Sequence, residues 1–403
     1  MTTLISFLGR AQADPETGYR TTRYRFPDGS EQDTPFFGLA LRQHLQADRL
    51  VIIGTPGSMW DVLVEHLARH RPADYEDPRL ALQEAVERQG VDEELLHRLR
   101  PLMAEHIGVP VEPLLIGYGR DLEEQQQLLD RLAESVAGEG RVHFDITHGL
   151  RHLAMLAQVA AHLLEALSSR LRVETIWYGA FELKENGTTP AIRLDGLLRI
   201  QQWIDAWRRF EDDGDYRVFA DLLEGEGLPA EKVAALRRAA HFEAVFNLPE
   251  ARRQLLNFLP LLDQPLPGAA RLFGRRLRER LDWVRKDDLY QHQRRLAQMH
   301  LRKGDYLRCA ILAVEAVLTR RMAESGEGDP NRYPDRQRAR EALKRDLQSA
   351  ARDRLWRDYR RLEYLRNALA HATAPDDPEI SKLLRNPERL PRELESLLSR
   401  LLT

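Results

Sequence analysis

Residues 142–151 have the sequence VHFDITHGLR, and this stretch decides the fold of the N-terminal half. Its first five residues, three of them apolar, predict a buried strand. An amphipathic pattern over residues 152–167 follows and predicts a helix. The loop between them carries hydroxyl, imidazole and guanidinium groups. A strand that leads through a polar loop into a helix is the repeating unit of a parallel α/β sheet.

The same unit recurs through the first 200 residues. Further buried strands are predicted at 4–9, 49–54, 111–117 and 173–181, with helices at 36–46, 60–70 and 122–136. Residues 72–100 predict a helical insertion. Asn186 and Gly187 mark a turn, so residues 175–183 and 188–194 predict a terminal hairpin. We therefore predict a Rossmann-like α/β domain with a parallel sheet over residues 1–196.

From residue 197 onward the pattern is helical. Segments 198–210, 216–223, 231–241, 250–258 and 269–285 predict helices between Gly and Pro breaks, and 197–288 is interpreted as a connecting region. In residues 289–403 we predict one long helix over 289–322, a loop over 324–331, and helices at 339–347 and 355–372, ended by the prolines that follow. This pattern predicts an all-α C-terminal helical bundle.

Composition is that of a globular protein, with 43% hydrophobic and 31% charged residues. The net charge of −3 hides an asymmetry, because residues 1–200 hold 21 basic and 30 acidic side chains and residues 201–403 hold 39 and 33. A basic second half suits a polyanionic partner. Cys309 is alone and no Cys/His cluster has zinc spacing, so we predict neither disulfide nor metal site. With no signal peptide or membrane span predicted, we expect a cytoplasmic protein.

Ligands of parallel sheets bind beyond the carboxyl ends of the strands, and four predicted loops there carry suitable groups. Backbone and hydroxyl donors beside helix N-termini favour a phosphate-bearing ligand. The candidate ligand-binding residues are Gly9, Arg10, Thr55, Gly57, Ser58, Trp60, Tyr118, Asp145, Thr147, His148, Gly149 and Arg151. A simpler interpretation of residues 145–151 also stands, in which Asp145 or Thr147 caps the helix and His148 packs or is solvated.

Near the end of the chain, residues 366–371 read RNALAH and suggest RNA cleavage. A phosphodiester beside a 2′-hydroxyl needs a proton shuttle, a cation and positioning, which His371, Arg366 and Asn367 can supply. The spacing alone is weak evidence, because Arg295 and His300 share it and a solvated helix surface would also carry such residues.

The arginine-asparagine pair followed by three residues and histidine resembles the active motif of HEPN ribonucleases, and the N-terminal half resembles a CARF domain. Together they resemble ancillary ribonucleases of type III CRISPR systems. The resemblance implies a homodimeric or larger assembly and a metal-independent endoribonuclease that leaves 2′,3′-cyclic phosphate ends on single-stranded RNA. It implies catalysis by Arg366, Asn367 and His371 and no cofactor. The expected allosteric activator is a cyclic oligoadenylate, cyclic tetra-adenylate in particular, near Arg10, Ser58, Thr147, His148, Gly149 and Arg151.

Two other functions stay open. A ligand-responsive nucleic-acid-binding regulator without nuclease activity would use the basic segment 271–295, although acidic residues interleave it as on a solvated helix surface. A toxin-type HEPN nuclease would lack small-molecule control, and the polar stretch 145–151 argues against it.

Overall fold

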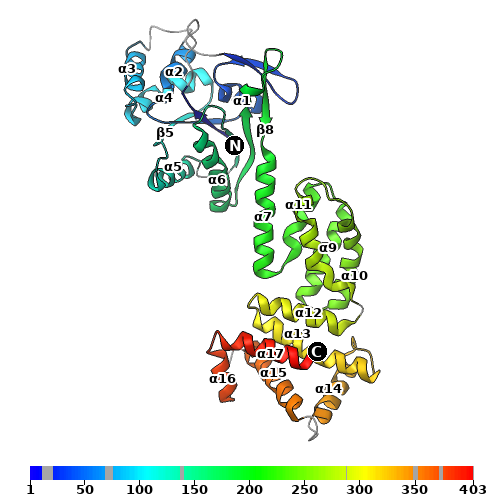
Figure 1. The fold of residues 1–403 in the computed structure, drawn as a ribbon. Helices are drawn as coiled ribbons and strands as arrows, with labels where there is room; N and C mark the ends of the chain where they lie inside the picture. Colours follow the sequence, from blue (N-terminus) through cyan, green and yellow to red (C-terminus); the bar gives the residue numbers. More distant parts are fainter. Residues whose placement is uncertain are drawn as a thin grey trace. The chain divides into compact units, whose positions relative to one another are not determined.

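The structure is a computed structural model that describes residues 1–10, 21–68, 76–136, 140–286, 288–347, 353–371 and 375–402. The chain divides into two compact units, Met1–Gln201 and Gln202–Thr403 (Figure 1). Helix α7 (Asp195–Asp213) begins in the first unit and ends in the second. Each unit is described by itself below.

The first unit is built on an eight-stranded sheet of order β3-β2-β8-β7-β6-β1-β4-β5. Its strands are β1 (Thr2–Leu8), β2 (Thr22–Arg25), β3 (Glu31–Thr34), β4 (Arg49–Gly54), β5 (Val111–Leu115), β6 (Gly140–Asp145), β7 (Leu171–Gly179) and β8 (Thr188–Arg193). Strands β5, β4, β1, β6 and β7 are parallel neighbours. The hairpin of β7 and β8 is antiparallel, as predicted, and turns at Asn186 and Gly187, both with positive φ. The α/β prediction for this half is confirmed.

Alternate residues of the central strands enter two separate cores, which is why these strands are apolar throughout. Leu4 and Leu50 face one core, and Ile5 and Val51 face the other. The first core is covered by α1 (Phe37–Leu45), α2 (Trp60–Ala68), α3 (Glu76–Glu87) and α4 (Glu93–Ile107). The second is covered by α5 (Leu122–Ser135) and α6 (Arg151–Leu167). A sheet covered on both faces exposes its strand ends, and the candidate ligand loops lie there.

The second unit is helical among the residues described. It contains the 3₁₀ turns η3 (Tyr216–Phe219), η4 (Leu259–Asp263) and η5 (Asp282–Arg285), and the helices α8 (Ala220–Gly225), α9 (Ala230–Ala244), α10 (Leu248–Phe258), α11 (Ala270–Leu281), α12 (Leu289–Arg302), α13 (Tyr306–Ser325), α14 (Tyr333–Leu347), α15 (Asp353–His371), α16 (Pro378–Leu384) and α17 (Arg389–Leu402). One hydrophobic core runs from Trp203 to Leu402. The structure therefore does not separate the predicted region 197–288 from 289–403.

Several local features extend or correct the prediction. Residues 22–34 form the hairpin of β2 and β3, for which no strands were predicted. The insertion is helical, as predicted, and holds two helices, α3 and α4, because Gln89 and Gly90 end the first and Asp92 caps the second. The long helix predicted over 289–322 is two helices, because Gly304 takes a φ of 75° and Asp305 caps α13. Finally, α16 and α17 follow the motif helix, and α17 buries Leu390, Leu394, Leu397, Leu398 and Leu402 in the core.

Gly9 supplies a test of the loop packing at the strand ends. A Cβ atom at Gly9 would lie 1.4 Å from the carbonyl oxygen of His148, so neither backbone can accept one without moving. We expect Gly9→Ala to destabilise the protein by about 3 kcal/mol, the upper end of the overpacking range. The control is Gly196→Ala in α7, where a Cβ meets nothing within 4 Å. Thermal unfolding measures both, and a Gly9→Ala protein as stable as the control would contradict this packing.

Candidate functional site

The Asp145 carboxylate organises the carboxyl edge of the sheet. Its side chain is fully buried at the end of β6. Oδ2 accepts a hydrogen bond from Ser6 Oγ of β1 at 2.6 Å, and Oδ1 accepts one from the Thr147 backbone at 2.9 Å. Thr147 Oγ1 in turn accepts from Gly179 N of β7 at 2.8 Å. These bonds tie the ends of three parallel strands together and use both oxygens of Asp145.

His148 joins the same network as a neutral ring. The backbone N–H of Phe37, at the start of α1, donates to His148 Nε2 at 3.2 Å, so this nitrogen carries no proton. Burial lowers the pKa of His148 and raises the pKa of Asp145, which favours the neutral imidazole. The His148 ring is therefore packed inside the protein, in line with the simpler interpretation of residues 145–151. The His148 carbonyl oxygen is the atom that approaches Gly9.

The loop after β4 is held by its own polar groups. Ser58 Oγ donates to Leu8 O at 2.7 Å and accepts from Thr55 N at 2.9 Å. The Trp60 ring is buried, and its Nε1 donates to Thr55 O at 3.0 Å. A Cβ on Gly57 would lie 2.9 Å from the Tyr118 hydroxyl, so these two loops are in close contact. Thr55, Ser58 and Trp60 are thus buried residues that support the loops at this edge.

The exposed cations of this edge are arginines. Arg10, Arg120 and Arg151 are exposed, and the Arg120 guanidinium lies 4.6 Å from the ring centroid of Tyr118. The cavity beside His148 holds about 20 Å³, which is room for roughly one water molecule. Space for a nucleotide-sized ligand at this edge is therefore found only on the exposed surface among the described residues, where Arg10 and Arg151 lie.

Sequence reasoning missed three contributors to this edge. Gln89 accepts from the Tyr118 hydroxyl at 3.2 Å, and His152 Nε2 lies 2.6 Å from the Tyr118 carbonyl oxygen. Gly38 of α1 lies against Ser6, because a Cβ there would be 2.1 Å from its Oγ. Only His152, directly after Arg151, could have been found from the motif. Tyr24 is buried in β2, and Tyr19 and Arg20 lie outside the described residues.

The RNALAH motif occupies the last two turns of α15. Tyr359, Leu362, Leu365 and Ala368 form the buried face of this helix. Arg366 is half-buried, whereas Asn367 and His371 are exposed. Among the described residues none of these three side chains has a hydrogen-bond or ion-pair partner.

Other arginines around α15 are held by carboxylates. Arg361 pairs with Glu393 at 3.0 Å and Arg400 with Asp358 at 2.7 Å, which fastens α15 to α17. The competing pair is also held: Arg295 lies 3.4 Å from Asp282, and His300 Nδ1 lies 3.3 Å from Asp305 Oδ2. Burial lowers the pKa of His300 to about 4. His300 is thus buried and Arg295 is an exposed residue held in an ion pair, whereas Arg366 and His371 have no such partner among the described residues.

In the described ranges no group of three His, Cys, Asp or Glu side chains is placed to hold a metal ion. No helix there is long and apolar enough to cross a membrane.

Comparisons with known proteins agree with the architecture of the first unit. Residues 3–182 match the family model described as CRISPR system endoribonuclease Csx1, CARF domain. Over 285 residues the chain is 25% identical to CRISPR-associated protein MJ1674 of Methanocaldococcus jannaschii. That match covers 65% of this chain and 44% of the relative, less than half of its length. These similarities support a ligand-sensing protein linked to type III CRISPR systems, with a CARF domain of the Csx1 type at its N-terminus.

Proposed function

We propose that the protein is an endoribonuclease of type III CRISPR antiviral defence, activated by a cyclic oligoadenylate bound at the CARF domain. The observation that carries the catalytic part is the set of Arg366, Asn367 and His371, which α15 leaves accessible and without partners among the described residues. The observation that carries the sensing part is the match of residues 3–182 to a CARF domain. The second unit would be the HEPN part of the enzyme.

The proposed reaction forms a 2′,3′-cyclic phosphate. The 2′-oxygen loses its proton to a base and attacks phosphorus, and the 5′-oxygen leaves with a proton. His371 supplies the proton transfer, Arg366 stabilises the charge on the phosphorane, and Asn367 positions the phosphate. The nucleophile belongs to the substrate, so the chemistry requires no metal-bound water.

Two copies of the chain would share one site. Arg366 and His371 are five positions apart, which separates them by about 140° around a helix with 3.6 residues per turn. One copy therefore presents the two groups in different directions. A two-fold axis places the same surface against itself, so that the arginine of one copy can meet the histidine of its partner.

The regulator without nuclease activity has less support. Its contact surface would be the basic segment 271–295, but five arginines of that segment already pair with carboxylates. These are Arg275, Arg278, Arg280, Arg285 and Arg295. Paired guanidinium groups offer little net charge to a nucleic-acid backbone.

Removing either reactive group should nearly abolish cleavage. We expect Arg366→Ala and His371→Ala each to lower the RNA cleavage rate at least 100-fold, since each removes a separate role worth roughly that factor. Asn367→Ala should cost less. The matched control is Arg360→Ala on the same helix, whose exposed guanidinium contacts only Tyr364 among the residues described. Near wild-type rates for Arg366→Ala and His371→Ala in folded protein would refute the assignment.

Chelation should leave the reaction intact. Because the 2′-hydroxyl is the nucleophile, we expect the rate of RNA cleavage to be unchanged in excess EDTA. The measurement is cleavage of end-labelled RNA with activator present, before and after chelation. Activity that disappears with EDTA and returns with magnesium or manganese would rule out this mechanism.

Arg151 should control sensitivity to the activator and not the chemistry. It is exposed at the start of α6, and a charge-assisted hydrogen bond from an arginine to phosphate is worth about 1.5–3 kcal/mol. We expect Arg151→Ala to raise the half-maximal activator concentration roughly 10- to 100-fold, with the maximal rate unchanged. A substitution at Ser58 would be harder to interpret than Arg151→Ala, because a bulkier side chain would break the hydrogen bonds of Ser58 to Leu8 and Thr55.

The measurement is a titration with cyclic tetra-adenylate and, separately, cyclic hexa-adenylate. Arg172→Ala is the matched control, since Arg172 is exposed near the opposite, amino end of β7. An unchanged half-maximal concentration with a collapsed maximal rate would place Arg151 in the link between sensing and catalysis and outside the activator site.

A further inference from the structure

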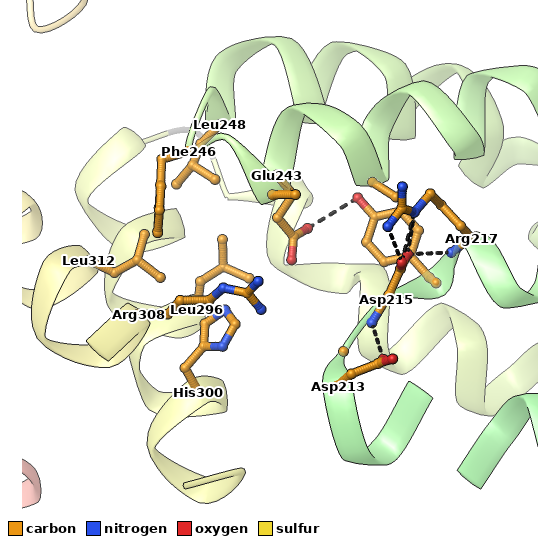
Figure 2. Close-up of a pocket in the computed structure, with 14 residues that line it drawn as sticks. Asp213, Asp215, Arg217, Glu243, Phe246, Leu248, Leu296, His300, Arg308 and Leu312 are labelled. Carbon is orange, nitrogen blue, oxygen red and sulfur yellow. Dashed lines mark hydrogen bonds and ion pairs between the residues drawn. The ribbon is translucent and has the colours of Figure 1, made fainter. Parts of the chain in front are cut away.

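The second unit contains a cavity of about 220 Å³ that is separate from the RNALAH motif. It is bounded by α9, α12, α13 and the turn that precedes η3 (Figure 2). Its volume equals roughly seven water molecules at ~30 Å³ each and falls below the ~300 Å³ at which drug-sized pockets begin. One small ring system fits such a space, whereas an oligonucleotide does not.

Among the carboxyl groups that line this cavity, Glu243 is the one that can accept further hydrogen bonds. Its Oε2 accepts from the Tyr216 hydroxyl at 3.1 Å, and its other oxygen has no partner among the described residues. Asp215, by contrast, is fully engaged by the backbone and side chain of Arg217. Asp213 accepts from the backbone of Asp215. Figure 2 shows the Glu243 carboxyl directed into the space between these groups and Arg308.

Burial raises the pKa of Glu243 to about 7. A carboxyl with a higher pKa in the folded than in the unfolded protein costs stability as pH rises from about 4.5 to about 7. At neutral pH the cavity therefore contains a carboxyl group, Glu243, whose ionised form additional N–H donors would stabilise. Arg308, on α13, carries the complementary donors, because among the residues described its guanidinium pairs through Nη1 alone, with Asp305 at 3.4 Å.

The remaining wall of the cavity is apolar and includes a strained aromatic residue. Phe246 has a φ of 60°, a conformation that is unusual for a bulky side chain, and 38% of its surface is exposed. Leu248, Leu296 and Leu312 continue this wall. A flat ring could stack on Phe246 while its edges meet the polar groups opposite.

We propose that this cavity binds a single guanine base, which stacks against Phe246 and is read by Glu243 and Arg308. Guanine offers N–H donors at N1 and the 2-amino group to the carboxylate, and acceptors at O6 and N7 to a guanidinium. Adenine places an amino donor where Arg308 needs an acceptor. If the base comes from RNA, the inference rests on the proposed nuclease function; a free guanine nucleotide is the other source, and the experiment separates them.

The pH dependence of binding follows from the direction of the Glu243 shift. Two N–H donors require the ionised carboxylate, so affinity should be highest above pH 8 and fall as pH drops through about 7. Neutral His300, with its pKa of about 4, does not titrate in this range. The other charged or titratable groups around Glu243 are Asp213, Asp215, Tyr216, Arg217, Lys303 and Arg308. The pKa of Tyr216 is raised and that of Asp215 lowered, so both keep their charge states.

The first experiment is calorimetric titration of the full-length protein with four nucleosides at pH 8 and pH 6. We expect guanosine to bind, inosine to bind about tenfold or more weakly because it lacks the 2-amino donor, and adenosine and cytidine not to bind. Guanosine should bind roughly tenfold more weakly at pH 6, where about one Glu243 in eleven is ionised. Equal affinity for adenosine and guanosine, or no effect of pH, would overturn the proposal.

Variants test the assignment of the contacts. Glu243→Gln keeps the size of the side chain but sets an amide donor against a guanine donor, so guanosine affinity should fall at least tenfold and lose its pH dependence. The matched control is Glu231→Gln, an exposed residue on the same helix, which should bind as wild type. Retained guanosine affinity in Glu243→Gln would overturn the proposal even if inosine were discriminated.

A third arm identifies the source of the base and separates the two proposals. RNA oligomers with and without guanosine are compared for binding to wild-type protein and Glu243→Gln. Guanosine-dependent RNA binding that Glu243→Gln removes supports a base of the substrate; guanosine binding without RNA discrimination supports a free nucleotide. If cleavage fails but guanosine binds, the nuclease proposal falls and this one stands. If RNA is cleaved but guanosine does not bind, the reverse holds.

Discussion

The two hydrogen bonds accepted by the buried Asp145 carboxylate are the constraint on which the sensing edge depends. They join the ends of β6 and β1 and hold the turn that carries Thr147 and His148. Because the carboxylate is fully buried, either bond, if lost, would leave a charged oxygen unsatisfied in the protein interior. The loop is therefore rigid, and the carbonyl of His148 can approach Gly9 more closely than any residue with a Cβ would permit.

In this arrangement the residues that hold the loops in place differ from those that are available to bind a ligand. Asp145, Ser58 and Trp60 are buried, and each uses its polar atoms within the protein. Arg10 and Arg151 extend from the same loops into solvent. A rigid base with a few exposed cations suits a phosphate-bearing ligand, because the cost of ordering the loops is met during folding and not during binding. The acidic balance of residues 1–200 is compatible with an anionic ligand, because Arg10, Arg120 and Arg151 are exposed at this edge.

The second unit also contains both polar groups that are paired within the protein and polar groups that remain available. Its core orders the helices through leucine and aromatic contacts, and carboxylates hold Arg361 and Arg400 beside α15, whereas Arg366 has no such partner among the described residues. The cavity around Glu243 is a second place where polar groups can form further hydrogen bonds. Both features lie in helices that share one core, so binding at Glu243 and chemistry at Arg366 would be supported by the same packed structure.

The sequence by itself determined the α/β class of the first unit and the helical nature of the second, and it supplied the candidate residues that remain proposals. Strands such as β4 could be predicted because a strand buried on both faces is continuously apolar, and helices such as α6 because one face alone is apolar. The hairpin of β2 and β3 could not be predicted, because short strands with charged alternate residues resemble a polar loop. The break at Gly304 was hidden, because the apolar stripe continues across it at helical spacing.

Only the tertiary structure decided which polar residues are buried and which remain available. Asp145 and Arg151 are six residues apart in one motif, yet the first is enclosed and the second exposed. Arg295 with His300 has the same spacing as Arg366 with His371, and the difference is that Asp282 and Asp305 lie beside the first pair. Glu243 had no sequence signal, because its environment comes from Tyr216 and Arg308, residues distant in the chain. Spacing along a chain fixes which groups share a segment, whereas burial and partners depend on segments that only folding brings together.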